Sequence, residues 1–308
     1  MTPEEHFELA RIKLEEARPL IKLFGLDYDG TISDGVDFKP PEVMALVEKI
    51  LGKGKSVAFV TASAATALKK LTAPFQGLLN HKNTSVRNFI AGGNGATLFE
   101  MKKDGLVEIY NHGMDLPQVL KAVEIGRKVY EKLGIKNIDL SKKGLENFRK
   151  ILRDNWESYI PAEILDVGRP YNGEIFTEQA KVTFVLPKDK LLHEKLAVEL
   201  NKELGEEYRA VAGDDTYIHI TKKLEEDGKV VAIKTILKIL GLEPNQVATF
   251  GDMPAGNDAG LLSFPYSFTN SNEFVDIKTN LEQPPYVLLE PGLSPVARIY
   301  KAVYYLLS

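Results

Sequence analysis

Residues 23–31, with the sequence Leu-Phe-Gly-Leu-Asp-Tyr-Asp-Gly-Thr, constrain the fold more than any other stretch of the chain. The continuous apolar run at their start is typical of a strand that is buried on both faces of a parallel sheet. In open α/β sheets, ligands bind just beyond the carboxyl ends of the strands. We therefore expect Asp27 and Asp29 at the mouth of a site, where a cation or a proton-transfer role offsets the repulsion between the two carboxylates.

Strand and helix patterns alternate on both sides of a long middle section, which predicts an α/β fold with a doubly wound parallel sheet, a Rossmann-like core. The expected elements before that section are a helix at 41–51 and strands at 56–60 and 88–91; those after it are a helix at 229–240, strands at 246–250, 266–268 and 286–289, and a helix from Ser294.

The middle section has a different pattern, in which helices are followed by paired strands. We expect a hairpin at 98–100 and 107–110, helices at 116–133, 144–152 and 190–204, and strands at 163–168, 180–186, 207–212 and 216–220. This pattern predicts a small α+β domain inserted into the first. The predicted division is a helical extension at 1–20, a core domain at 21–98 and 223–308, and an inserted cap domain at 99–222.

Composition narrows the classes of function. The chain has 308 residues, no cysteine and a net charge of −4. The absence of cysteine excludes a thiolate nucleophile and a zinc-thiolate site, and the net charge argues against a general nucleic-acid binder. No apolar run reaches the length of a membrane span, and the N-terminus is acidic where a secretion signal is basic. We expect a cytoplasmic protein without a nucleic-acid or membrane partner, and its oligomeric state stays open.

Two further positions are candidates for the same site. Thr61 ends the second strand, where a hydroxyl and free backbone N–H groups can hold a phosphoryl oxygen, although a helix N-cap threonine is the simpler reading. Lys229 lies on the same helical face as Ile233 and Ile236, whereas Lys234 lies off that face. We therefore expect Lys229 to point toward the core, although most lysines are solvated.

Residues 251–258, Gly-Asp-Met-Pro-Ala-Gly-Asn-Asp, follow a buried strand late in the chain. Their acidic oxygens could complete an octahedral Mg2+ shell together with Asp27 and water. These motifs, in this order, resemble those of the haloacid dehalogenase-like phosphohydrolases. Asn-Gly-Ala at 94–96 and Thr-Asn at 269–270 are similar to the Cof-like and sucrose-phosphatase-like branch. In that branch the cap lies between the second and third motifs, which is where this chain has room for one.

The resemblance implies a role for each matching residue. Asp27 would be the nucleophile and a metal ligand, and Asp29 the general acid/base, with its backbone carbonyl on the metal. Thr61 and Lys229 would stabilise the charge of the phosphoryl group, and Asp252 would bind Mg2+, the implied cofactor. Behind them, Asn257 and Asp258 would support the metal and phosphate, although the loop that carries them is longer than in the usual motif.

The expected function is that of a Mg2+-dependent phosphatase, a phosphoric monoester hydrolase. Its substrate would be a small phosphorylated metabolite, such as a sugar or polyol phosphate, and the reaction would pass through an aspartyl-phosphate. A phosphomutase or other phosphotransferase uses the same residues and stays open as the alternative. A non-catalytic binding or regulatory module is disfavoured because Asp27, Asp29 and Asp252 are all present. A dehalogenase is also disfavoured, because the dehalogenase relatives do not keep the second aspartate of the first motif, which is Asp29 here.

The expected cap strands suggest where a substrate would be gripped. In the strands at 180–186 and 216–220, apolar and polar residues alternate, which fits a sheet with helices on one face. If the cap closes as a lid, the polar face of its sheet faces the substrate. The candidate substrate-binding residues are therefore Lys181 and His219, with Arg169 and Asn172 as further candidates, against the simpler reading of a solvated sheet face.

Overall fold

The computed structural model describes most of the chain. The described residues are 2–34, 37, 40–62, 74–79, 86–114, 116–132, 181–185, 190–212, 217–271 and 284–308. The expected helix at 144–152, the expected strand at 163–168 and the candidates Arg169 and Asn172 lie outside these residues.

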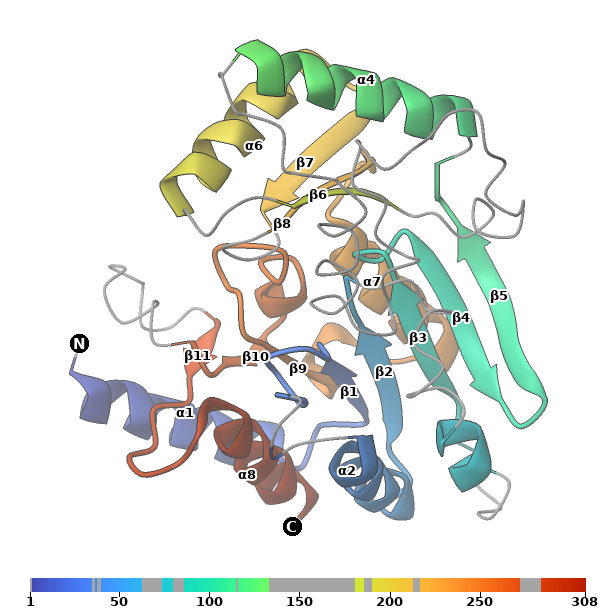
Figure 1. The fold of residues 1–308 in the computed structure, drawn as a ribbon. Helices are drawn as coiled ribbons and strands as arrows, with labels where there is room; N and C mark the ends of the chain where they lie inside the picture. The colour runs from blue at the N-terminus through green and yellow to red at the C-terminus, as the bar shows by residue number, and fades with distance from the viewer. Residues whose placement is uncertain are drawn as a thin grey trace.

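An eight-stranded sheet forms the centre of the molecule (Figure 1). The strands lie in the order β11-β10-β9-β1-β2-β3-β4-β5, and the six from β11 to β3 run parallel. Their bounds are β1 Leu23–Leu26, β2 Ser56–Val60, β3 Asn88–Gly92, β4 Thr97–Lys102, β5 Gly105–Asn111, β9 Val247–Gly251, β10 Tyr266–Thr269 and β11 Tyr286–Val287.

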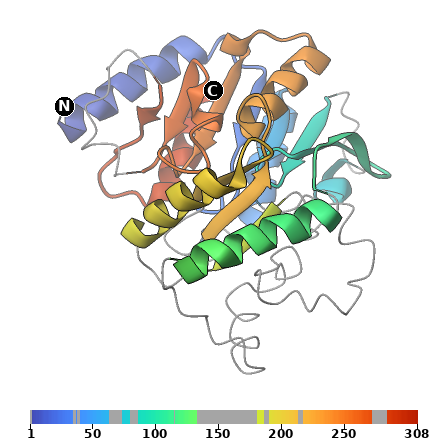
Figure 2. The ribbon, with the colours of Figure 1, turned by 90° about the horizontal axis from the view of Figure 1, so that it is seen from above.

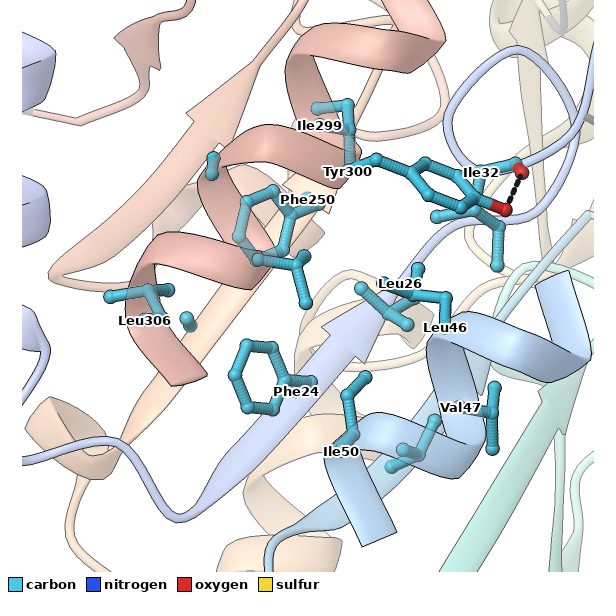
Figure 3. Close-up of a cluster of buried hydrophobic side chains, with 14 of the residues drawn as sticks. Phe24, Leu26, Ile32, Leu46, Val47, Ile50, Phe250, Ile299, Tyr300 and Leu306 are labelled. Carbon is cyan, nitrogen blue, oxygen red and sulfur yellow. Dashed lines mark hydrogen bonds between the residues drawn. The ribbon is translucent and has the colours of Figure 1, made fainter. Parts of the chain in front are cut away.

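Helices cover both faces of this sheet, which explains why its central strands are apolar throughout. On β1, Phe24 and Leu26 point into a hydrophobic cluster with α1 (Pro3–Ala17), α2 (Pro40–Gly52) and α8 (Pro295–Leu307). Leu23 points to the opposite face and packs in a second cluster with α7 (Gly228–Leu240). Figure 3 shows Phe24 and Leu26 of the first cluster between α2 and α8. The predicted α/β fold class is confirmed.

Local sequence signals fix the ends of these helices. Thr2 caps α1 in a capping box with Glu5, and Ser294 caps α8. The side chain of Asp227 accepts a hydrogen bond at the start of α7, which ends at Gly241 with a left-handed backbone (φ 65°). Polar N-caps and a left-handed glycine at the C-terminus are the usual helix boundaries, so the boundaries expected from the sequence agree closely with those observed.

The N-terminal helix α1 packs on the core through α8, β10 and β11. Its buried residues Ala10, Leu14 and Ala17 recur at helical spacing, as the sequence indicates. Within the described part of the chain, no helix, α1 included, is both long enough and apolar enough to cross a membrane.

A smaller α+β unit lies over the carboxyl ends of the core strands (Figure 1). Its three-stranded antiparallel sheet has the order β6-β8-β7, with β6 Lys181–Val185, β7 Tyr208–Ala212 and β8 Tyr217–Lys222. Helices α4 (Leu116–Lys132) and α6 (Lys190–Leu204) pack on one face of this sheet and, as Figure 2 also shows, lie on the side away from the core. Ile218 and Ile220 of β8 are buried under them.

The hairpin at 97–111 differs from expectation, because the sequence assigns it to the cap from residue 99 onward. In the structure β4 pairs antiparallel with β3, and β5 with β4, so the hairpin extends the core sheet. The physical reason is burial on both faces of β4: Phe99 packs in one core cluster and Leu98 in the other. The predicted boundary between 98 and 99 therefore falls inside β4, while the division into domains stays a prediction.

A buried hydrogen bond from α8 supports the turn after β1. The Tyr300 hydroxyl donates to the backbone carbonyl of Ile32 at 3.1 Å, as Figure 3 shows. We expect Tyr300→Phe to lower the free energy of unfolding by about 1–3 kcal/mol, because the Ile32 carbonyl would stay buried without this donor. Urea unfolding measures this change. The matched control is Tyr304→Phe on the more exposed side of α8, expected within about 0.5 kcal/mol of the parent. Equal losses would contradict the assignment.

Candidate active site

The register of the parallel strands brings residues from distant parts of the chain to one edge of the sheet. Leu26 of β1 stands opposite Phe59 of β2 and Phe250 of β9. The residues that follow these strands, among them Asp27, Thr61 and Asp252, therefore lie at the same carboxyl edge. The chain leaves β1 toward β2 and β3 on one side and returns through β9 toward β10 and β11 on the other. Such a switch in strand order opens the crevice in which ligands of doubly wound sheets bind.

Lys229 lies at the centre of this edge. Its side chain is fully buried, and its ammonium Nζ donates to Oδ1 of Asp27 at 2.9 Å and to Oδ1 of Asp258 at 2.5 Å. Lys234 instead forms an exposed ion pair with Glu226. The helical phase expected from the sequence therefore gives the observed orientation of both lysines.

The carboxylate of Asp258 is fixed by hydrogen bonds at both oxygens, although a long loop precedes this residue. Its Oδ1 accepts from Lys229, and its Oδ2 accepts from the backbone N–H groups of Asp252 and Met253, each at 3.0 Å. Gly251 makes this approach possible, since a Cβ there would lie 2.8 Å from the Asp258 carboxyl. Because both of its oxygens accept these hydrogen bonds, Asp258 is placed to orient Lys229 and the turn at Asp252.

The turn after β1 brings Asp27 and Asp252 together. The Thr31 hydroxyl lies 3.3 Å from Oδ2 of Asp27 and 3.2 Å from Oδ1 of Asp252, so it can bridge them. Gly30 has a positive φ of 76°, and a Cβ there would lie 2.4 Å from Oδ2 of Asp252. The Asn270 amide donates to the Gly30 carbonyl at 3.1 Å. Only glycine at position 30 allows this close approach.

Burial and charge oppose each other at this cluster. Burial raises the pKa of Asp27 well above its ordinary value; Asp258 adds to the effect, and Lys229 opposes it. Burial, together with Asp258, also raises the pKa of Asp252 to about 7. Burial alone would lower the pKa of Lys229, but the carboxylates of Asp258 and Asp27 outweigh it, so the net shift is upward. The protein alone therefore does not compensate the charge of the ionised carboxylates.

The cluster fits a divalent cation. Asp27, Asp252 and Asp258 each offer a carboxylate oxygen, and these atoms lie within 4.8 Å of one another. When all three are ionised, the single charge of Lys229 leaves two negative charges uncompensated. Carboxylate oxygens are the ligands that Mg2+ prefers. Because Asp258 is engaged by Lys229 and two amides, Asp27 and Asp252 are the carboxylates best placed to bind a metal.

Three other predicted residues differ in their surroundings. Asp29 is exposed, two residues beyond Asp27. Thr61 is buried, and its backbone N–H donates to the carbonyl of Ala91 at 2.9 Å. Asn257 lines a cleft between the core and the small domain, and its carboxamide oxygen is buried without a hydrogen-bond partner among the described residues. The roles predicted for these residues stay predictions.

The two described candidates for substrate binding in the small domain, Lys181 and His219, lie in strands near the same cleft. Arg209, Val211 and Thr221 line it from the small domain, and Asp227 and Gly228 from the core. His219 is buried and stands opposite Val211 in the sheet, and Lys181 stands opposite Thr221. Both candidates therefore occupy register positions next to residues of the cleft, and their contact with a substrate stays a prediction.

Sequence reasoning missed four residues that the structure brings to the site. Thr31 and Asn270 belong to stretches that the motifs include, but nothing in the pattern reveals their contacts across the sheet. Asp227 could have been found as an N-cap, since it stands just before an apolar helical pattern. Arg209 carries no such signal, because its partner Asp227 lies in a different domain of the predicted division.

The comparison with known proteins agrees with this geometry. The family model described as haloacid dehalogenase-like hydrolase matches residues 24–272 of this chain. No curated protein matches this chain. Solved structures resemble the fold at low sequence identity.

Three of these structures cover most of the chain. An IMP-bound, N-terminally truncated IMP-nucleotidase from Plasmodium falciparum is 15% identical, with a TM-score of 0.56 over 96% of this chain and 70% of that one. A structure from a phosphoryl-transfer superfamily is 18% identical, with a TM-score of 0.58 over 92% and 96%. A haloacid dehalogenase-like hydrolase from Bacteroides thetaiotaomicron is 14% identical, with a TM-score of 0.53 over 83% and 91%.

The two lysines of α7 provide a direct test of the buried cluster. We expect Lys229→Met to lower the free energy of unfolding by about 3–5 kcal/mol in metal-free buffer, because it leaves buried carboxylates without their cation. Lys234→Met is the matched control; it removes an exposed ion pair and should change stability by about 0.5 kcal/mol or less. Urea unfolding of both variants measures the difference. The opposite ranking would show that Lys229 does not compensate the cluster.

Proposed function

Because the chain belongs to the haloacid dehalogenase-like hydrolases, we propose that it is a Mg2+-dependent phosphatase that hydrolyses a small phosphorylated metabolite. One observation carries the proposal. The buried carboxylate of Asp27 lies at the carboxyl edge of the sheet, with Lys229 at one oxygen and Thr31 at the other. A carboxylate fixed at both oxygens is oriented for attack on an electrophile entering the crevice.

In the first step, an oxygen of Asp27 attacks phosphorus as the bond from phosphorus to the leaving oxygen breaks. The product is an aspartyl-phosphate, and the leaving group departs as an alcohol after accepting a proton from Asp29. Asp29 is exposed at the edge of the site, so it can exchange protons with a ligand or with water. Lys229 favours the ionised form of Asp27, which a nucleophile requires.

In the second step, Asp29 takes a proton from water, whose oxygen attacks phosphorus. The bond between phosphorus and Asp27 breaks, inorganic phosphate leaves, and Asp27 returns to its carboxylate form. Lys229 and the hydroxyl of Thr61 stabilise the charge of the phosphoryl group in both steps. Catalysis of phosphoryl transfer rests mainly on such positioning and charge stabilisation.

Asp27, Asp252 and the backbone carbonyl of Asp29 would hold Mg2+, with Asp258 and Asn257 behind them. The ion would neutralise charge on the carboxylates and on the phosphate. The uncompensated charge of the cluster supports this assignment, since the carboxylates of Asp27, Asp252 and Asp258 lie close together and only one ammonium, that of Lys229, pairs with them.

A sugar or polyol phosphate is the substrate class that we favour. The small domain lies over the carboxyl edge of the core sheet, where it can close on a leaving group. Lys181 and His219 are the residues of that domain that we propose for contacts with the leaving group. The IMP-nucleotidase that resembles this chain was solved with IMP bound, which is also a phosphate monoester.

Replacing the nucleophile gives the most direct test. We expect Asp27→Asn to abolish phosphate release from every ester that the parent hydrolyses, because the amide oxygen is a poor nucleophile. The fold should survive, since asparagine keeps the shape of the side chain. A phosphate-release assay over a panel of sugar phosphates measures the loss, with Asp104→Asn in the exposed turn between β4 and β5 as the control. Retention of a tenth of the parent activity would exclude Asp27 as the nucleophile.

Metal dependence is a separate prediction. Chelation should stop phosphate release, and Mg2+ should restore it; Ca2+ should inhibit, because its looser and higher coordination misplaces the attacking oxygen. Mg2+ should also raise the Tm of the parent protein by relieving carboxylate repulsion, and this increase should be smaller in Asp252→Asn. Full activity after exhaustive chelation would refute the metal assignment.

A further inference from the structure

Asp227 joins the two segments that carry Lys229 and Asp258. It is the N-cap of α7, and its Oδ1 accepts a hydrogen bond from the backbone N–H of Lys229 at 3.0 Å. The same carboxyl lies against Gly260, two residues beyond Asp258, where a Cβ would lie 2.1 Å from Oδ1 of Asp227. The side chains of Lys229 and Asp258 meet at 2.5 Å. The Asp227 carboxyl therefore contacts the segments that carry both partners of this ion pair.

The second oxygen of Asp227 is engaged by the small domain. Nη1 of Arg209 donates to Oδ2 of Asp227 at 3.1 Å. Arg209 belongs to β7 and stands opposite Thr221 of β8, which is the strand that leads the chain back to α7. Within the described residues, the Asp227 carboxylate thus connects the small domain to the start of α7, which carries Lys229, and to the end of the loop that carries Asp258.

We propose that Asp227 is a positioning residue that makes the placement of Lys229 depend on the position of the small domain, with Arg209 as the connecting group. The proposal concerns regulation of the site described above, and its kinetic consequence rests on the proposed phosphatase function. When the small domain is seated as in this structure, Arg209 fixes the Asp227 carboxylate. When the domain moves away, that carboxylate keeps the helix cap but loses one of its two constraints.

Exposure distinguishes this role from a purely stabilising one. The side chain of Arg209 is 47% exposed and that of Asp227 27% exposed. Ion pairs this exposed add little to the stability of a folded protein. The geometry of the ion pair still restricts the positions of both side chains. The pair is therefore better suited to orienting Asp227 than to stabilising the fold.

The chain offers substitutions that separate the two contacts of Asp227. Asp227→Ser keeps the helix cap, because serine is as good an N-cap as aspartate, but it cannot pair with Arg209. Arg209→Gln removes the same ion pair from the other side. Lys223→Gln is the control, since Lys223 lies next to β8 and pairs with Glu206, which is also exposed. If the ion pair acts as proposed, the double variant Arg209→Gln/Asp227→Ser should behave like either single variant.

Hydrogen exchange tests the connection without relying on catalysis. In the full-length protein, we expect the backbone amide of Lys229 to exchange about threefold faster in Arg209→Gln and in Asp227→Ser than in the parent, because the opening of the first turn of α7 becomes easier. Lys223→Gln should leave this rate unchanged. An unchanged rate in Arg209→Gln would overturn the proposal, and so would additive changes in the double variant.

Kinetics tests the consequence for the reaction. We expect kcat for the best sugar phosphate to fall about twofold to fivefold in Arg209→Gln and Asp227→Ser, with little change in KM, because the pair acts on a group that stabilises the transition state. Lys223→Gln should keep the parent kcat. An unchanged kcat in both variants would overturn the proposal while the parent remains a phosphatase. If the parent releases no phosphate from any ester, the proposed function fails, and hydrogen exchange alone decides the connection.

Discussion

The buried contact between one ammonium and several carboxylates is the interaction on which the site depends. Lys229 is completely buried, and burying a charge is costly unless opposite charges and hydrogen bonds surround it. Asp27 and Asp258 supply them directly, and two backbone amides hold Asp258 in place. The carboxylates in turn need more positive charge than a single lysine provides. The cluster therefore carries more negative charge than the lysine compensates, which is the condition for binding a cation.

The doubly wound sheet is what allows these groups to meet. Asp27 follows β1 and Asp252 follows β9, strands far apart in the sequence that are direct neighbours in the sheet. Because parallel strands end at the same edge, side chains from both halves of the chain converge there without long loops. Lys229 approaches from the face covered by α7, and glycines at 30 and 251 remove the Cβ atoms that would keep the carboxyls apart. Topology brings the groups to one edge, and small residues close the remaining distance.

The sequence predicts well the strands and the helix that carry this site. It predicts poorly the hydrogen bonds and ion pairs that connect them. The strands before Asp27 and Asp252 and the orientation of Lys229 follow from apolar runs and helical phase, which are local signals. The hairpin at 97–111 extends the core sheet, which the sequence does not reveal for a physical reason: a hairpin pattern indicates that two strands pair, but not which sheet they join. The bridging by Thr31 and the ion pair between Arg209 and Asp227 are contacts across the fold, so no local periodicity contains them. The domain limits and the chemical roles of the site residues stay predictions.

The order of the chain adds one last constraint. Asp27 and Asp252 stand at the ends of strands that are hydrogen-bonded into the sheet, so their positions are fixed by the most rigid part of the protein. Lys229 instead lies at the second position of a helix that the chain enters directly after the small domain. Only a short connection after β8 separates Lys229 from the small domain. Asp27 and Asp252 are thus held by the strands of the sheet, whereas the ammonium that pairs with Asp27 is held by a helix whose first turn contacts the small domain through Asp227 and Arg209.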